Sequence, residues 1–283
     1  MEFFTSYDGT ELAYHVVGDG PAVICLPGGP MQASAYLGAL GGLSAHHQLI
    51  MLDLRGTGQS AQPKNPGTFR CDQLVDDVEA LREHLGLDRM DLLAHSAGAN
   101  LALLYLSRHP ENVERLLLIT PSVMAVGVTI TGDDRLRIAR LRRDEPWFSA
   151  AFAALETIVA GKATADSWQA IAPFYYGRWD EAARAHRAAE DGQKNTEAAK
   201  IFAADGAFDP DTTRRALARF RSPVLLLAGE VDLAAPPGAM AELAELFPHA
   251  ELVIQPRTGH FPWLDDAEQF VTRTVAFLAE ATA

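Results

Sequence analysis

The feature that most constrains the fold of this chain is an alternation of short apolar runs with segments of helical character. The runs that predict strands lie at residues 22–26, 48–54, 90–95, 114–120, 223–228 and 251–254. Helices are predicted between and after them, at residues 72–85, 101–107, 239–246 and 265–280. This alternation is typical of a parallel sheet flanked by helices, so an α/β fold is predicted.

Two segments depart from the alternation. At the start of the chain, residues 2–7 and 11–17 predict a hairpin that turns at Asp8-Gly9. After Pro121 the strands stop, and a long segment rich in Ala, Arg and Glu with scattered aromatics predicts a helical insert. The predicted organisation is a core formed by residues 1–122 and 216–283, with a helical cap formed by residues 123–215.

Composition and charge argue against several classes of protein. The net charge is −13, which disfavours nucleic acid as a partner because phosphate binding needs basic patches. No run of about 18 apolar residues predicts a membrane span, and the first residues show no signal-peptide pattern, so a cytoplasmic location is expected. Cys25 and Cys71 lack metal-ligand spacing, and no metal or cofactor is predicted. The oligomeric state is left open.

The strongest chemical signal is the motif Ala94-His95-Ser96-Ala97-Gly98, which directly follows an apolar strand and directly precedes a helix. A serine on such a tight turn projects its hydroxyl outward, and small residues two positions away on either side permit the strained backbone. Alanine stands here where the usual pattern has its first glycine. An isolated serine before a helix is more often an N-cap, but the strand–turn–helix context favours Ser96 as a nucleophile.

A serine hydroxyl is a weak nucleophile at neutral pH, so it needs a base, and an acid must orient that base. In proteins with this strand–turn–helix serine motif, the nucleophile comes first along the chain, followed by an Asp or Glu and then by the His. Asp232 follows the strand predicted at residues 223–228, with Glu230 as the alternative acid. His260 lies in a Gly-His-Phe-Pro loop after the last strand and is the candidate base. The side chain of His95 is expected to point away from Ser96.

Two further loops are expected to support the serine. The oxyanion formed on attack needs two backbone N–H donors, which are expected from Ala97 and from Gly29 in the glycine-rich loop at residues 27–31. Asp53 and Arg55 lie at the end of another strand, where they are expected to hydrogen-bond and fix the loop beneath the catalytic turn. A place for Arg55 in the substrate site is the alternative.

Together these motifs resemble the α/β-hydrolase superfamily over nearly the whole chain outside the insert. Gly28-Gly29-Pro30 with Asp53-Leu54-Arg55-Gly56 is most similar to the prolyl iminopeptidase family and its esterase-like neighbours. The resemblance implies an α/β-hydrolase fold, a mostly parallel sheet flanked by helices with an inserted helical cap. It also implies removal of an N-terminal proline from peptides, or cleavage of related amides and esters. The chain departs from the family pattern at Pro27 and Met31 and around the serine.

The function predicted is that of a serine hydrolase, which cleaves an ester or amide of a small molecule or short peptide through an acyl-enzyme. Open alternatives are an esterase, thioesterase or lactonase for a small apolar acyl substrate, a carbon–carbon bond hydrolase with the same triad, and a non-catalytic ligand-binding relative. Iminopeptidases of this family hold the substrate amine with cap carboxylates, and the near-neutral charge of the insert gives that reading no support.

Selectivity is expected to reside in the cap. The candidates for substrate contact are aromatic residues of the insert and one beside His260: Trp147, Tyr175, Tyr176, Trp179 and Phe261. The neighbouring aromatics Trp168, Phe174 and Trp263 could take part as well. Aromatic residues in helices are more often core than pocket, so each candidate also has a packing interpretation.

Overall fold

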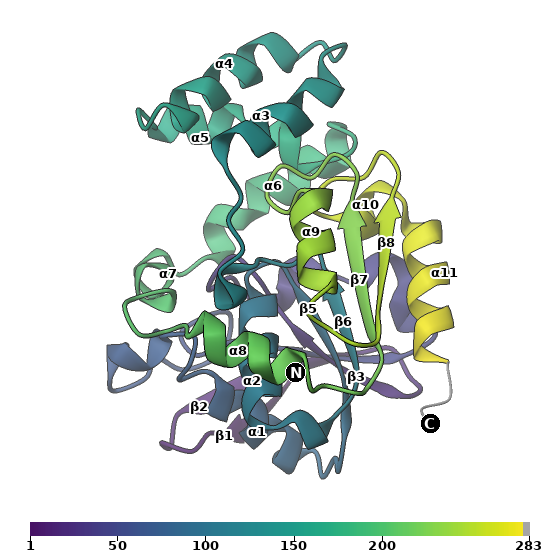
Figure 1. The fold of residues 1–283 in the computed structure, drawn as a ribbon. Coiled ribbons are helices and arrows are strands. Elements are labelled where there is room, and N and C mark those ends of the chain that lie inside the picture. Colours follow the sequence, from purple (N-terminus) through teal and green to yellow (C-terminus); the bar gives the residue numbers. More distant parts are fainter. Residues whose placement is uncertain (280–283) are drawn as a thin grey trace.

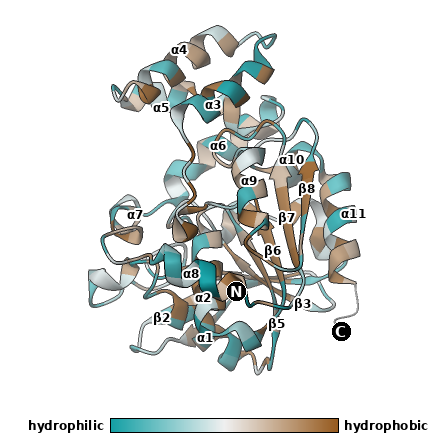
Figure 2. Cartoon of the chain, viewed as in Figure 1, coloured by the Kyte–Doolittle hydropathy of each residue, from teal (hydrophilic) through white to brown (hydrophobic). Residues whose placement is uncertain are grey.

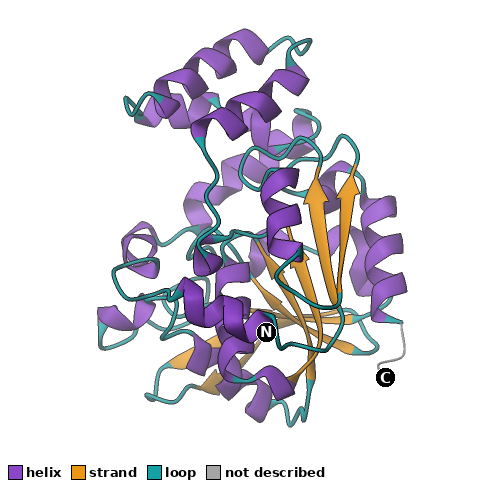
Figure 3. Ribbon diagram, in the orientation of Figure 1, coloured by secondary structure: helices purple, strands orange, loops and turns teal. Residues whose placement is uncertain are grey.

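A single eight-stranded sheet lies at the centre of the computed structural model, which describes residues 1–279 (Figures 1 and 3). The strands are β1 (Glu2–Thr5), β2 (Glu11–Val17), β3 (Ala22–Leu26), β4 (Gln48–Leu52), β5 (Met90–His95), β6 (Val113–Ile119), β7 (Val224–Gly229) and β8 (Ala250–Gln255). Their order across the sheet is β1-β2-β4-β3-β5-β6-β7-β8. β1 and β2 form the predicted hairpin, β2 also pairs antiparallel with β4, and the other pairs are parallel. The predicted α/β-hydrolase fold is confirmed.

The inner strands are buried on both faces, which is why their sequences read as continuous apolar runs (Figure 2). Side chains of a strand alternate between the two faces. On β3, Ile24 and Leu26 pack into the larger core, whereas Val23 and Cys25 pack into a second core on the opposite face. The sheet therefore separates two apolar layers, each of which needs its own cover of helices.

Helices supply both covers. The larger core lies under α1 (Val75–His84), α2 (Gly98–Arg108), α8 (Pro210–Leu217) and α9 (Pro237–Ala244). The second core lies under η1 (Ser34–Leu37), η2 (Leu40–Ala45), α10 (Pro262–Asp265) and α11 (Ala267–Leu278). Further 3-10 turns are η3 (Pro66–Phe69), η4 (Pro110–Asn112), η5 (Met124–Val126), η6 (Arg140–Arg142) and η7 (Ala172–Tyr175).

The insert after β6 is helical, as predicted. Its helices are α3 (Gly132–Ala139), α4 (Phe148–Val159), α5 (Ala165–Ala170), α6 (Glu181–Gln193) and α7 (Thr196–Phe202). Figure 1 shows α3, α4 and α5 as an outer lobe above the carboxyl ends of the strands, with α6 beneath it. The lobe has a small apolar core of its own, which includes Leu155, Phe174 and, from the loop after β7, Leu233. The predicted division at residues 123–215 stays a prediction, and within that range Phe202 packs into the larger core.

The observed bounds differ from the predicted ones for local reasons. α2 begins at Gly98 rather than at residue 101, because the helix starts directly after the serine turn. The predicted helix at residues 265–280 is interrupted at Asp266, whose carboxylate accepts a hydrogen bond from the Gln269 N–H and caps α11. Its predicted end at residue 280 lies outside the described residues. Within residues 1–279, no helix is long and apolar enough to cross a membrane.

Candidate active site

Ser96 occupies the turn between β5 and α2 with a φ of 52°, a left-handed conformation that is rare for a residue with a side chain. The turn fits because two glycines leave room for it. A Cβ on Gly28 would lie 2.8 Å from the Ser96 Cβ, and a Cβ on Gly98 would lie 2.4 Å from the Pro27 carbonyl oxygen. Glycine is therefore required at both positions by close packing of the glycine-rich loop against the serine turn.

Three side chains from different loops form one hydrogen-bonded line. The Ser96 Oγ lies 2.8 Å from His260 Nε2, and His260 Nδ1 lies 2.8 Å from Asp232 Oδ2. Because a carboxylate only accepts, the proton of the neutral ring is on Nδ1, and Nε2 is free to accept from the serine. Glu230, the alternative acid, is exposed and accepts a hydrogen bond from the Arg257 N–H instead.

The two backbone groups expected to form the oxyanion hole are free to donate. Among the hydrogen bonds of residues 1–279, none is donated by the N–H of Gly29 or of Ala97. The neighbouring Gly28 N–H is already engaged, since it donates to the Tyr36 hydroxyl at 2.7 Å. Gly29 lines the same cavity as Ser96, and Ala97 follows Ser96 in the chain. Two unpaired N–H groups are what a tetrahedral oxyanion needs.

Next to the serine turn lies a buried hydrogen-bond network around His95, which the sequence did not predict. His95 Nε2 lies 2.9 Å from the His260 carbonyl oxygen, and His95 Nδ1 lies 2.7 Å from the Tyr36 hydroxyl. A carbonyl only accepts, so Nε2 carries the proton and the tyrosine donates to Nδ1. Burial, and then the nearby His260 ring, lower the pKa of His95 well below its ordinary value, which keeps the ring neutral. Thr120 Oγ1 donates to the same His260 carbonyl at 2.9 Å.

The loop that carries His260 is also fixed from the cap side. The Asp265 carboxylate accepts hydrogen bonds from the Gly259 N–H and the Gly177 N–H, both at 2.8 Å. The His260 N–H donates to the Tyr175 carbonyl at 2.7 Å. Burial raises the pKa of Asp265, and these backbone donors oppose that rise. The cap segment at residues 175–177 therefore holds the histidine loop in place.

The connection between α6 and α7 crosses the glycine-rich loop. Gln32 and Lys194 form an antiparallel β-bridge, and the Asn195 N–H donates to the Met31 carbonyl at 2.9 Å. The Lys194 Nζ donates to the Gly29 carbonyl at 3.1 Å. Cap residues thus fix the backbone of the residue whose N–H was predicted to bind the oxyanion.

A cavity of about 440 Å³ opens onto the serine. Of the aromatic residues predicted to contact substrate, Tyr175, Tyr176 and Phe261 line it. Trp168, which was named as a further possibility, also lines it and is 51% exposed. Gly29 and the catalytic candidates Ser96 and His260 belong to the same lining.

Trp147 and Trp179 do not reach this cavity, which corrects the prediction that they contact substrate. In the outer lobe the Trp147 ring packs edge-on against the Phe174 ring, with 5.0 Å between the ring centroids. The Arg142 guanidinium lies over the same indole, 4.9 Å from its centroid. The Trp179 ring packs against Tyr176, with 5.5 Å between the ring centroids. Both indoles serve packing within the cap, a role that aromatic content alone does not distinguish from a pocket role.

Three charged residues in the C-terminal half of α6 and directly after it line the same cavity: Arg187, Glu190 and Lys194. Arg187 and Glu190 are three residues apart and lie on one face of α6, and Lys194 follows directly after the last residue of the helix with extended backbone angles. The Glu190 carboxylate lies 3.0 Å from the Arg187 guanidinium and 3.9 Å from the Lys194 ammonium. These residues were not singled out from the sequence, because charged residues at helical spacing usually form a solvated face.

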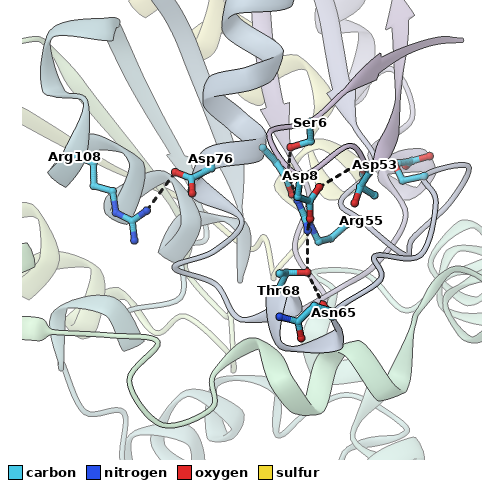
Figure 4. Close-up of polar contacts among 11 residues, drawn as sticks. Ser6, Asp8, Asp53, Arg55, Asn65, Thr68, Asp76 and Arg108 are labelled. Atoms are coloured by element: carbon cyan, nitrogen blue, oxygen red, sulfur yellow. Dashed lines mark hydrogen bonds and ion pairs between the residues drawn. The ribbon is translucent and has the colours of Figure 1, made fainter.

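Asp53 and Arg55 fix their loop through separate partners (Figure 4). The Asp53 carboxylate accepts hydrogen bonds from the N–H and hydroxyl of Ser34, both at 2.8 Å. The Arg55 side chain is fully buried. Its Nε donates to the Asp77 carboxylate at 2.7 Å, and its Nη1 donates to the Asp8 carboxylate at 2.8 Å. Neither residue lines the serine cavity, so both act as structural support for the loop.

The two cysteines are structural residues of the core. Cys25 and Cys71 are both free and buried, and burial raises the pKa of each thiol. In the part of the chain that the structure describes, no group of three or more His, Cys, Asp or Glu side chains is placed to hold a metal ion.

Comparison with known proteins places these features in a family context. A family model described as alpha/beta hydrolase fold matches residues 21–267. The proline iminopeptidase of Lactobacillus helveticus is 37% identical over 117 residues, but the alignment covers 39% of this chain and only 40% of that relative. The putative carbamate hydrolase RutD of Caulobacter sp. (strain K31) is 26% identical over 95% of this chain and 97% of its own length. The solved esterase of Exiguobacterium antarcticum superposes with a TM-score of 0.74 at 19% identity, over 98% of this chain and 99% of its own, which shows a common fold.

Proposed function

The chain belongs to the α/β hydrolase fold family, and from that premise we propose that it is a serine hydrolase that cleaves a carboxylic ester through an acyl-enzyme. The observation that carries the proposal is the hydrogen-bonded line of Ser96, His260 and Asp232 beside two unpaired backbone N–H groups. Ligand binding alone would require neither the line nor the donors, because both serve charge and proton movement.

In the first half of the reaction, the Ser96 Oγ attacks the carbonyl carbon while its proton passes to His260 Nε2. Asp232 accepts from Nδ1, holds the ring in the required tautomer and stabilises the imidazolium that forms. The negative charge develops on the carbonyl oxygen, where Gly29 and Ala97 can donate their free N–H groups. Loss of one such donor typically lowers kcat about 10²- to 10³-fold.

Collapse of the tetrahedral intermediate breaks the bond to the leaving alcohol, which takes the proton from His260. The acyl group is then an ester of Ser96. In the second half a water molecule attacks this ester, giving its proton to His260 Nε2, and the serine leaves with that proton restored. The products are an acid and an alcohol, and the enzyme returns to its starting protonation state.

The charges around the cavity favour an ester over a peptide with a free amino terminus. A site for a substrate ammonium needs a carboxylate that is free to pair with it. Among the described residues that line the cavity, Glu190 is the carboxylate, and it already faces Arg187 and Lys194. A proline iminopeptidase is the second candidate, favoured by the similarity to the Lactobacillus helveticus protein.

Two assays test the proposal. A fluorophosphonate probe should label the wild-type chain at Ser96 and leave Ser96→Ala unlabelled, and short p-nitrophenyl esters should be cleaved by the wild type alone. A folded wild-type chain that takes up no probe would overturn the hydrolase proposal. Release of p-nitroaniline from proline-p-nitroanilide faster than the turnover of the esters would favour the iminopeptidase.

A further inference from the structure

The C-terminal half of α6 and the residue that follows it bring an excess of positive charge to the serine cavity. Arg187 in α6 and Lys194 directly after α6 both line the cavity, with Glu190 between them in the sequence. The two basic side chains are 29% and 27% exposed, so they are accessible to a ligand without being fully solvated. Arg184 belongs to the same helix but is exposed and does not line the cavity.

The hydrogen-bond capacity of the two cations exceeds that of their partners. A guanidinium has five N–H donors and an ammonium has three. Arg187 Nη1 meets Glu190 at 3.0 Å and, at 3.6 Å, the exposed Asp191. Lys194 Nζ donates to the Gly29 carbonyl at 3.1 Å and lies 3.9 Å from Glu190, beyond ordinary hydrogen-bond length. Donors therefore remain for a ligand with oxygen acceptors.

The position of Lys194 locates this charge relative to the reaction. Its ammonium contacts the carbonyl of Gly29, and the N–H of the same residue is the proposed oxyanion donor. The positive group and the oxyanion hole thus lie at opposite ends of one residue. An anionic substituent held there would be only a few atoms from the scissile carbonyl.

Resting on the proposed ester hydrolysis, we propose that the natural substrate has an acyl chain that ends in a carboxylate, which Arg187 and Lys194 bind. The substrate class is the half-ester of a short dicarboxylic acid. A carboxylate meets both cations favourably, because charge-assisted hydrogen bonds to oxygen anions are among the stronger polar contacts in proteins. A substrate ammonium at the same place would be repelled by both.

The test compares two esters of equal length, mono-4-nitrophenyl adipate and 4-nitrophenyl hexanoate, which differ at the chain end. The wild type should show the higher kcat/KM for the adipate. Arg187→Gln and Lys194→Gln should each lower the adipate-to-hexanoate ratio about tenfold, the usual scale for losing a hydrogen bond to a charged group. Arg184→Gln makes the same change of charge on the same helix outside the cavity and should keep the wild-type ratio.

The outcomes separate this proposal from the proposed function. Turnover of hexanoate that equals or exceeds that of adipate would overturn the carboxylate subsite and leave ester hydrolysis standing. An equal fall of the adipate-to-hexanoate ratio in Arg184→Gln would also overturn it, because the preference would then come from the net charge of the protein and not from a subsite. If wild type cleaves neither ester, ester hydrolysis fails, and calorimetric titration of adipate into Ser96→Ala decides the subsite. If adipate binds to Ser96→Ala and the added Arg187→Gln substitution weakens that binding, the carboxylate subsite is supported. If adipate does not bind, the subsite is overturned.

Discussion

Replacement of Gly28 by alanine tests directly how tightly the glycine-rich loop must pack against the serine turn. The added methyl would lie 2.8 Å from the Ser96 Cβ and 2.9 Å from the His95 carbonyl oxygen. Non-bonded carbon atoms pack at about 3.5–4.0 Å, so the loop and the turn would have to separate by about 0.7–1.2 Å. The loop cannot retreat freely, because the Gly28 N–H is bonded to Tyr36.

The separation has two measurable consequences. A displacement of about 1 Å between reacting groups costs about 10² in rate, so kcat for a p-nitrophenyl ester should fall about 100-fold. Overpacking of a filled interior costs about 1–3 kcal/mol, so the free energy of unfolding should fall by that amount. Fluorophosphonate labelling of Ser96 should slow in parallel with kcat, because both depend on the same approach of the serine to an electrophile.

Gly238→Ala is the matched control for this substitution. Gly238 lies in α9, where an added Cβ would have no heavy atom within 4 Å. The free energy of unfolding should rise by about 0.5–1 kcal/mol, since alanine is the better helix former, and kcat should not change. A Gly28→Ala chain whose kcat stays within about threefold of wild type would refute the argument that this close contact sets the catalytic geometry.

Three further changes have expected outcomes. Asp232→Asn should lower kcat by about 10³- to 10⁴-fold with the circular dichroism spectrum unchanged, because the imidazole loses the carboxylate that fixes its tautomer; a loss below tenfold would count against its role. Tyr36→Phe leaves His95 Nδ1 without its donor, so urea unfolding should show a loss of about 1–3 kcal/mol, and an unchanged midpoint would contradict the network. Hydrogen bonds from Arg82 lower the pKa of Glu79 to about 2, so the stability that this carboxylate provides above its ordinary pKa is lost as the pH falls toward 2. Between pH 5 and pH 3 the wild type should therefore lose about 1 kcal/mol more than Glu79→Gln, and equal losses would refute the assignment.

The sequence predicted those parts of the molecule that follow from local pattern and chain order. Strands buried on both faces read as apolar runs, so the sheet could be predicted before its pairing was known. Ser96, Asp232 and His260 could be proposed together because each follows a strand, and the carboxyl ends of parallel strands meet at one edge of the sheet. Gly98 stood out because a small residue beside the serine permits the strained turn, and Gly28 because it belongs to the glycine-rich loop.

The parts that could not be predicted depend on contacts between distant segments. His95 and Tyr36 are 59 residues apart, and His260 and His95 are 165 apart, so no local pattern links them. Arg187 and Glu190 have ordinary helical spacing, and only the fold shows that they line the same cavity as Ser96. The aromatic candidates of the insert were chosen by residue type, which could not tell that Trp147 packs inside the cap.

The contacts between cap and core argue that the cap takes part in setting the catalytic geometry. Lys194 holds the Gly29 carbonyl, the Tyr175 carbonyl accepts from the His260 N–H, and Leu233, next to Asp232 in sequence, packs into the core of the outer lobe. The glycine-rich loop, the histidine loop and the loop of Asp232 thus each have a partner in the cap. A movement of the cap must break some of these contacts or carry the loops with it. A ligand that favours one position of the cap therefore also favours one geometry of the serine, its base and its oxyanion donors, and by linkage that geometry favours the ligand in return.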